Sequence, residues 1–269
     1  MRRLRVLMSR REISPEELSG ATAVVIDVLA ATTTLLTIMK NGARRIFPAR
    51  SLEEADEIAV KLDGAQPIRG GEQGGKSIPG YDRGPLPEEY PPEAVAGRDV
   101  IFVTTNGTRA IAGAASANTI LVGCLRNAPA IARYLEDSGT ESAYLVCAGS
   151  KGRFNTEDFL GAATILSYMD PDGWRLDDAA TMALEFADHH RGNIRQALES
   201  GRVGRWFVEN GHARTLDFFG EVGASGLTPE VVDGRLRRPA ISGQRSAISQ
   251  EPAAAYQRKK TGRDDEPAP

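Results

Sequence analysis

The sequence is poor in the residues that build disulfide frameworks and transition-metal sites: its 269 residues include two cysteines and three histidines. Cys124 and Cys147 each lie in an apolar, strand-like context, which favours small buried side chains over a disulfide. His189 and His190 are neighbours in an expected helix, where adjacent side chains point apart, and His212 lies further along the chain. We therefore expect no histidine-based zinc site.

Long apolar runs and a strong excess of one charge are also missing. No run approaches the ~20 residues needed to span a bilayer. Arg2, Arg3 and Arg5 are not followed by an apolar segment with a small-residue cleavage site, so a secretory signal is not expected. The formal net charge of -3, with 26% charged residues, gives no indication of a nucleic-acid or membrane-surface partner. A cytoplasmic enzyme is the default expectation.

Strand-like and helix-like segments alternate along most of the chain, which predicts an α/β fold. We expect buried strands at residues 4–8, 46–48, 100–103, 120–122 and 144–147, in addition to the strand discussed next. The composition of residues 240–269 is mostly small, polar or charged, so this segment lacks the apolar surface that would offset the entropy lost on ordering. We therefore expect one domain over residues 1–239 and a disordered tail over residues 240–269.

The most informative segment is residues 24–34, in which an apolar run ends at Asp27 and leads into Thr32, Thr33 and Thr34. The run predicts a buried parallel strand, and the helical spacing after it places the threonines at a helix N-terminus. Ligands bind at this edge of open α/β sheets, and a helix N-terminus suits an oxyanion. A carboxylate beside an anion cradle needs a cation between them, which indicates a metal-dependent phosphate or sulfonate site. The alternative, that Asp27 only caps the helix, is equally compatible with its position.

Similar polar turns follow other expected strands. Residues 104–109 open a helix with amides and hydroxyls that suit an oxyanion, and residues 148–158 mix basic side chains with two carboxylates. If the strands are parallel and share one sheet, all these turns converge on one edge. The candidate substrate-binding residues are Thr32, Thr33, Thr105, Asn106, Gly107, Thr108 and Lys151.

The acidic side chains of these turns are hard oxygen ligands, which suit Mg²⁺ with phosphate completing its shell. Asp27 is a candidate nucleophile as well as a ligand, Asp158 a candidate acid or base, and Arg109 a candidate for stabilising phosphoryl oxygens. Each also has a simpler interpretation as a helix cap or solvated charge. The candidate metal ligands are Asp27, Glu72, Asp82 and Glu157.

Residues 70–77 satisfy the P-loop pattern Gly-x-x-x-x-Gly-Lys-Ser. A P-loop leaves a buried strand and opens a helix, so that free amides meet the phosphates. Only Pro67 and Ile68 precede the segment, which is too little for a buried strand, and Pro79 would break a helix after Ser77. We therefore expect a long functional loop here and no nucleotide-binding P-loop.

Six motifs occur in order in this chain: residues 24–34, 71–72, 79–82, 104–111, 123–127 and 147–158. Together they resemble the 2-phosphosulfolactate phosphatase family over residues 4–239, with residues 104–109 as the most specific part. The resemblance implies a three-layer α/β/α sandwich with a mainly parallel sheet. It also implies Mg²⁺-dependent hydrolysis of 2-phosphosulfolactate to sulfolactate and phosphate, a step towards coenzyme M. The partner would then be a small phosphorylated acid, and the sequence leaves open whether the chain forms a homo-oligomer.

Two segments depart from the family pattern. Ala30 stands where the family usually has arginine, and Gly84-Pro85-Leu86-Pro87 stands where it usually has Gly-Asn-Ser-Pro. Loss of a guanidinium from a strand-end turn removes a bidentate contact to an anion. The competing hypothesis is therefore a binder of small phosphorylated metabolites that has changed its specificity or lost the chemistry.

Overall fold

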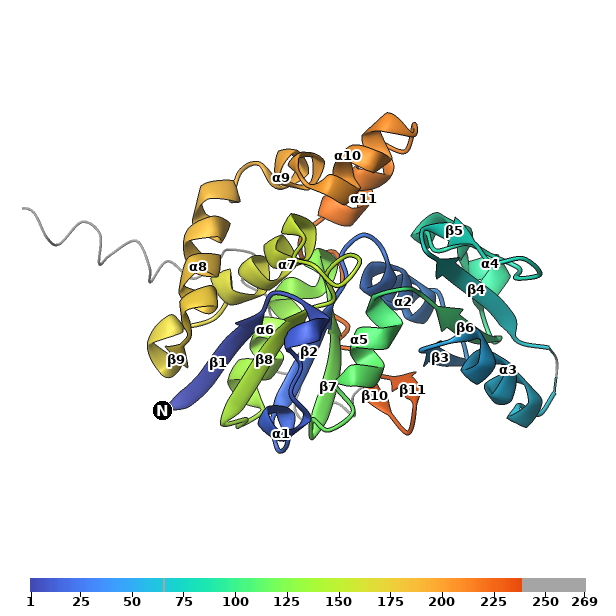
Figure 1. The fold of residues 1–269 in the computed structure, drawn as a ribbon, viewed down its shortest axis with the longest axis horizontal. Helices are drawn as coiled ribbons and strands as arrows, with labels where there is room; N and C mark the ends of the chain where they lie inside the picture. Colours follow the sequence, from blue (N-terminus) through green and yellow to red (C-terminus); the bar gives the residue numbers. More distant parts are fainter. Residues whose placement is uncertain (65, 239–269) are drawn as a thin grey trace, which may run out of the picture.

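One sheet runs through the whole molecule in this computed structural model, which describes residues 1–64 and 66–238 (Figure 1). Within those residues the sheet has eleven strands, in the order β5-β4-β6-β3-β11-β10-β7-β2-β8-β1-β9. The expected tail at residues 240–269 lies outside the described residues, as do residues 65 and 239. Among the described helices, none has both the length and the apolar character needed to cross a membrane.

The sheet consists of two parallel blocks. The first block contains β4 (Ile68–Gln73), β6 (Asp99–Val103) and β3 (Arg45–Ala49). The second contains β7 (Thr119–Gly123), β2 (Thr22–Ile26), β8 (Ser142–Cys147), β1 (Arg2–Leu7) and β9 (Trp174–Leu176). The predicted α/β fold with a mainly parallel sheet is confirmed.

A short hairpin joins the two blocks. Its strands are β10 (Glu230–Val232) and β11 (Arg235–Arg237), which pair with each other, with β7 and with β3, always antiparallel. Figure 1 shows the hairpin between β7 and β3. The sequence analysis missed these strands, because three residues are too few to display an alternating pattern.

Helices cover both faces of the sheet. On one face of β2, Val24 and Ile26 share a core with α6 (Ala128–Asp137), α7 (Thr156–Ser167) and α8 (Asp178–His190). On the other face, Ala23 and Val25 share a core with α2 (Ala31–Lys40) and α5 (Gly107–Gly113). The first block is covered in addition by α3 (Leu52–Lys61). This arrangement is the expected three-layer sandwich.

The remaining elements are short. They are η1 (Arg10–Glu12), α1 (Pro15–Leu18), β5 (Lys76–Ser77), η2 (Pro87–Glu89), α4 (Pro92–Val95), η3 (Leu125–Asn127), η4 (Pro171–Gly173), α9 (Ile194–Ser200), α10 (Arg202–Glu209) and α11 (Thr215–Gly220). Helices α9 to α11 follow one another beyond the end of α8 (Figure 1). Both cysteines are buried and unpaired, as expected.

The glycine-rich segment at residues 70–77 is not a loop, which corrects the prediction. Residues 68–73 form β4, which pairs with β6 in parallel and turns back into β5. The glycines are needed where the backbone meets its neighbours: a Cβ on Gly70 would lie 1.8 Å from the Tyr90 hydroxyl oxygen, and one on Gly71 1.8 Å from the Val103 carbonyl oxygen. Because a turn and a strand follow, with no helix, a P-loop is excluded as predicted.

Candidate active site

Asp27 lies where a turn of the second block contacts a turn of the first. It follows β2, it is 7% exposed, and its carboxylate accepts backbone hydrogen bonds from Ala31 and Gly107. These two residues begin α2 and α5, so one carboxylate lies at the N-termini of two helices. Negative charge is favoured at this position because the first amides of a helix have no partner within it.

Two opposing effects act on the pKa of Asp27. Burial, and after it the nearby negative charge of Glu72, raise the pKa to about 7, although the hydrogen bonds from Ala31 and Gly107 lower it. Glu157 adds a smaller effect in the same direction as Glu72. A carboxyl group that titrates this close to neutrality is typical of functional sites.

Gly107 allows α5 to approach Asp27. A Cβ at this position would lie 2.5 Å from the Cβ of Ala31 and 2.8 Å from Oδ2 of Asp27. Only glycine therefore lets the turn after β6 contact the turn after β2. The convergence of strand-end turns expected from the sequence occurs here, although the two turns belong to different blocks of the sheet.

Glu72 is held against the same turn by residues of the first block. Its Oε1 accepts a hydrogen bond from the Thr105 amide at 2.6 Å, and its Oε2 accepts from the Thr105 hydroxyl at 2.9 Å and from the Gly75 amide at 2.6 Å. The β4–β5 hairpin thus positions this carboxylate. Glu72 and Asp27 are close enough for their charges to interact.

The turn at residues 104–108 is held by internal hydrogen bonds. The Thr104 amide donates to the Thr108 hydroxyl at 3.0 Å, and the Thr108 amide donates to the Thr104 hydroxyl at 3.1 Å. Asn106 lies between them, and its Oδ1 is buried with no hydrogen-bond partner among the described residues. An orphaned buried oxygen on the residue before Gly107 calls for a ligand, because leaving such a group unpaired is costly.

Asp158 and Glu157 begin α7, as predicted, and both are fully buried. Asp158 accepts hydrogen bonds from the amides of Val28 and Gly149, both at 2.9 Å, and so connects the turns after β2 and β8. Burial raises the pKa of Asp158 well above its usual value, and the charge of Asp27 raises it further. Asp158 therefore braces the site, and its predicted acid–base role stays a prediction.

Glu157 connects the site to α10. Its Oε1 accepts hydrogen bonds from the amides of Val203 and Gly204 at 2.7 and 2.9 Å. Its Oε2 is buried with no partner among residues 1–64 and 66–238. The predicted metal-ligand role stays a prediction, since one carboxylate oxygen already satisfies the N-terminus of α10.

The threonines of α2 brace the backbone. The Thr32 hydroxyl donates to the Asp27 carbonyl at 2.8 Å, the Thr33 hydroxyl to the Val28 carbonyl at 3.0 Å, and the Thr34 hydroxyl to the Pro85 carbonyl at 2.7 Å. All three side chains are fully buried. They hold the turn around Asp27 in place, and substrate contact by Thr32 and Thr33 stays a prediction.

Three further predicted residues are one carboxylate held by a backbone amide and two exposed cations. Asp82 accepts a hydrogen bond from the Arg69 amide of β4 at 2.8 Å. Arg109 is exposed on α5, two residues after Gly107, and Lys151 is exposed on the turn after β8. The charges of Glu72 and Glu157 both act on Asp27, and the metal-ligand roles of all four carboxylates stay predictions.

The sequence analysis missed two cationic residues, Arg10 and Arg11, which follow β1 in η1. Burial lowers the pKa of Arg10, and the neighbouring charges of Arg109 and Arg11 lower it further. The Arg10 Nε is buried with no partner in the described part of the chain. A Cβ on Gly152 would lie 2.2 Å from Nε of Arg11, so the turn carrying Lys151 packs against this cluster. The sequence could have pointed to Arg10 and Arg11, because they follow an expected strand as the other polar turns do.

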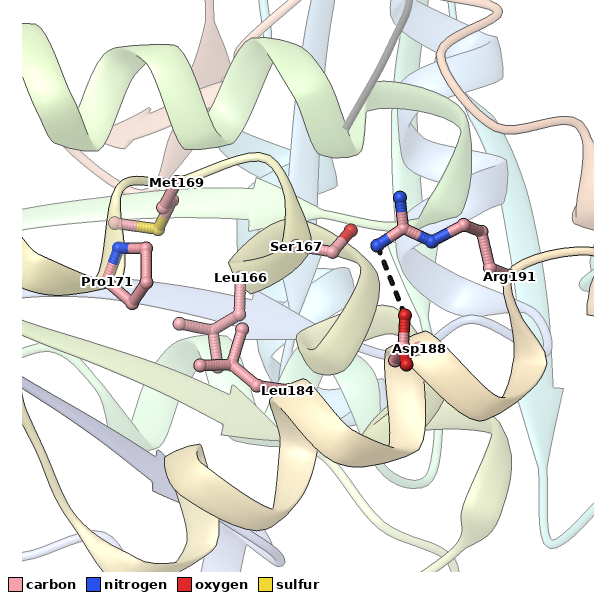
Figure 2. Close-up of a pocket in the computed structure, with 7 residues that line it drawn as sticks. All are labelled: Leu166, Ser167, Met169, Pro171, Leu184, Asp188 and Arg191. Carbon is pink, nitrogen blue, oxygen red and sulfur yellow. Dashed lines mark ion pairs between the residues drawn. The ribbon is translucent and has the colours of Figure 1, made fainter. Parts of the chain in front are cut away.

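A small cavity near the other end of α7 is unrelated to these residues. It lies between α7 and α8 beside the Asp188–Arg191 ion pair of 3.5 Å, and Figure 2 shows the seven side chains around it. Its volume of about 20 Å³ suffices for little more than one water molecule. It cannot hold a substrate.

The donor set around Asp27 is small for a metal site built from protein ligands alone. Among the described residues, no three side chains of the His, Cys, Asp and Glu types are placed so that they could hold a metal ion together. Mg²⁺, however, commonly uses one or two carboxylates and completes its shell with water and substrate phosphate. Asp27, Glu72 and the unpartnered Oδ1 of Asn106 fit that pattern of donors.

Comparisons with known proteins find relatives over most of the chain. The family model described as 2-phosphosulpholactate phosphatase matches residues 7–234. A probable 2-phosphosulfolactate phosphatase of Symbiobacterium thermophilum is 38% identical over 223 residues, covering 82% of this chain and 95% of that protein. Proteins with the same name from Caldanaerobacter subterraneus and Deinococcus radiodurans are 33% and 36% identical, each covering 84% of this chain and 93% of the relative.

Proposed function

Since the chain belongs to the 2-phosphosulfolactate phosphatase family, we propose that it hydrolyses the phosphate ester of a small anionic hydroxy acid. The substrate to test first is 2-phosphosulfolactate, which the names of the relatives specify. The observation that carries the proposal is the Asp27 carboxylate, buried between the N-termini of α2 and α5. Such a position concentrates positive potential where a phosphoryl group would develop negative charge.

We further propose that the reaction depends on Mg²⁺. Asp27 and Glu72 would hold the ion, with the Asn106 side-chain oxygen as a third donor. Burial first, and then the charge of Glu72, raise the pKa of Asp27, and a bound divalent cation would relieve the repulsion between the two carboxylates. When bound, the ion would polarise the phosphoryl oxygens and neutralise charge on the leaving ester oxygen.

The cationic side chains around the site account for an anionic substrate. The charges of Arg109 and Arg11 both act on Arg10, whose Nε is buried without a partner among the described residues. Carboxylate, sulfonate or phosphate groups of a substrate would supply the missing hydrogen-bond acceptors, and guanidinium groups bind them in bidentate geometry. These arginines would orient the substrate while Asp27 faces the phosphoryl group.

Asp27 can act in its ionised form in two ways: as a ligand that positions the attacking water, or as the nucleophile itself. The second route passes through an aspartyl phosphate, which hydroxylamine intercepts as a hydroxamate. Mass spectrometry of enzyme quenched with hydroxylamine during turnover separates the two routes, because only the nucleophile acquires the adduct.

Phosphate release from 2-phosphosulfolactate, 2-phospholactate and 3-phosphoglycerate, each with Mg²⁺ and with EDTA after metal stripping, tests the proposal. We expect release only with the divalent cation, fastest with the most anionic substrate. Full turnover in excess EDTA would refute the metal requirement. Tight binding of all three compounds without phosphate release would support the competing function, a metabolite binder that has lost the chemistry together with the arginine at position 30.

A further inference from the structure

A second charged cavity lies at the beginning of β3, away from the polar turns that follow the strands. Its volume of about 370 Å³ falls within the range of small-molecule sites. Five arginines line it, and we call it the arginine pocket: Arg44, Arg45, Arg235, Arg237 and Arg238. This concentration of one charge is unexpected in a chain whose formal net charge is -3.

The hairpin that joins the two blocks of the sheet creates this concentration. In the antiparallel pairing of β11 with β3, Leu236 lies opposite Ile46, and both side chains are buried. One step along the same register places Arg237 opposite Arg45, and alternation turns both side chains to the other face of the sheet. Like charges directly opposite each other destabilise a strand pair. The fold therefore tolerates a repulsive contact at this position.

The neighbouring carboxylates offset only part of this charge. Asp99 is buried and accepts hydrogen bonds from both Arg44 and Arg45. Asp233 pairs with Arg237 at 3.0 Å. Among the described residues these are the two carboxylates that pair with the five arginines.

The other two arginines of the pocket form no ion pair with a carboxylate of the described residues. Arg238 donates to the Met39 carbonyl at 3.3 Å, at the end of α2. Arg235 is half-buried, and its guanidinium makes neither a hydrogen bond nor an ion pair with any residue that the structure describes. A half-buried guanidinium without a protein acceptor, in a cavity of ligand size, is free to bind an acceptor from outside.

We propose that the arginine pocket binds a small polyanion that carries at least two phosphate groups. Guanidinium groups favour phosphate because their planar donors pair with two of its oxygens at once. A single phosphate group could engage two of the arginines, and the remaining positive charge calls for a second group on the same ligand. This site is separate from the one around Asp27, so it does not depend on the phosphatase proposal.

Isothermal titration of the full chain in EDTA, with pyrophosphate as the probe, tests the proposal. The variant is Arg235→Gln/Arg237→Gln. The matched control is Arg3→Gln/Arg175→Gln, which removes a pair of arginines in register on β1 and β9 that lines neither cavity. We expect the variant to bind pyrophosphate roughly tenfold more weakly or to lose one bound equivalent, while the control binds like the wild type. Inorganic phosphate should bind the wild type much more weakly than pyrophosphate.

Two further measurements keep the result interpretable. Without a probe, the variant should melt no lower than the wild type, because cross-strand repulsion has been removed, and it should lose the rise in melting temperature that pyrophosphate causes. The Asp27→Asn protein should keep the binding. Unchanged pyrophosphate affinity in Arg235→Gln/Arg237→Gln, or an equal loss in the control, would overturn the proposal.

Discussion

At the scale of single residues, Asp27 combines the two interpretations that its position in the sequence left open. It accepts hydrogen bonds from the first amides of two helices, as a cap does, and it is buried next to Glu72, as a reactive carboxylate is. A sequence can reveal one adjacent helix, that of α2. It could not reveal the second, because Gly107 reaches Asp27 only through the packing of two blocks of the sheet.

The raised pKa of Asp27 predicts how the stability of the protein changes with pH. The folded-state pKa is about 7, above the ~3.9 of an unfolded aspartate, so the folded state binds more protons between these values. The stabilisation present at low pH is therefore lost as the pH rises through about 7. An asparagine side chain cannot ionise, so the Asp27→Asn variant should not lose this stabilisation. Its melting temperature relative to that of the wild type should therefore be several degrees higher at pH 8 than at pH 5, both measured in EDTA.

The substitution also changes the hydrogen bonds of this side chain, but that effect is the same at both pH values. It therefore cancels when the difference in melting temperature between variant and wild type at pH 5 is subtracted from the difference at pH 8. Asp63→Asn, at an exposed aspartate, is the matched control and should show no such gain. A wild-type protein and an Asp27→Asn variant that keep the same difference at both pH values would contradict the assigned protonation.

Ala30 offers a second prediction at this scale. It is half-buried and caps α2 next to the turn that carries Asp27, so an arginine there can reach the site. If the family's arginine binds the sulfonate, Ala30→Arg should raise kcat/KM for 2-phosphosulfolactate roughly ten- to hundredfold, because a charge-assisted contact contributes ~1.5–3 kcal/mol. The gain should be much smaller for 2-phospholactate. Equal gains on both substrates would place the arginine on the phosphate group instead.

At the scale of helices and strands, most elements could be predicted because their apolar patterns are local. The glycine-rich segment was misread for a physical reason: glycine lowers strand propensity, yet Gly70 and Gly71 lie in β4 because Tyr90 and Val103 approach their backbone. That requirement arises from residues that are distant in the sequence. The alternation of apolar and polar residues within residues 70–77 therefore does not reveal the strand.

The contact between α5 and the turn after β2 predicts the effect of a single methyl group. In Gly107→Ala the new Cβ would collide with the Ala31 Cβ and Asp27 Oδ2, so the N-terminus of α5 must move away from the carboxylate. We expect kcat to fall at least tenfold while the protein stays folded, measured as phosphate release beside a melting curve.

Gly113→Ala is the matched control, since it lies in the same helix and its Cβ would meet only the Cδ1 atom of Ile13, at 3.1 Å. The Gly113→Ala variant should keep normal activity. Equal activity losses in both variants would show that α5 matters for stability alone.

At the scale of the whole molecule, the sequence predicted the class of fold and the gathering of polar turns, but it attributed this gathering to one shared edge. The structure instead brings together turns from two blocks that the β10–β11 hairpin joins. Long-range pairing of three-residue strands depends on neighbours that a sequence does not identify, such as Leu236 opposite Ile46. The sequence also could not show that the Asp82 carboxylate accepts a hydrogen bond from the Arg69 amide of β4, or that the charges of Glu72 and Glu157 act on Asp27, because these contacts join segments that lie apart in the sequence.

The central claim is that the Asp27 carboxylate at this junction carries the chemistry, and its most direct test is the turnover of Asp27→Asn on 2-phosphosulfolactate with saturating Mg²⁺. The side chains are nearly isosteric, so the fold should survive. The account predicts that less than about a tenth of the wild-type rate remains, a loss of more than ~1.4 kcal/mol of transition-state stabilisation. A folded variant that keeps a larger fraction of the rate would mean that Asp27 is only a helix cap.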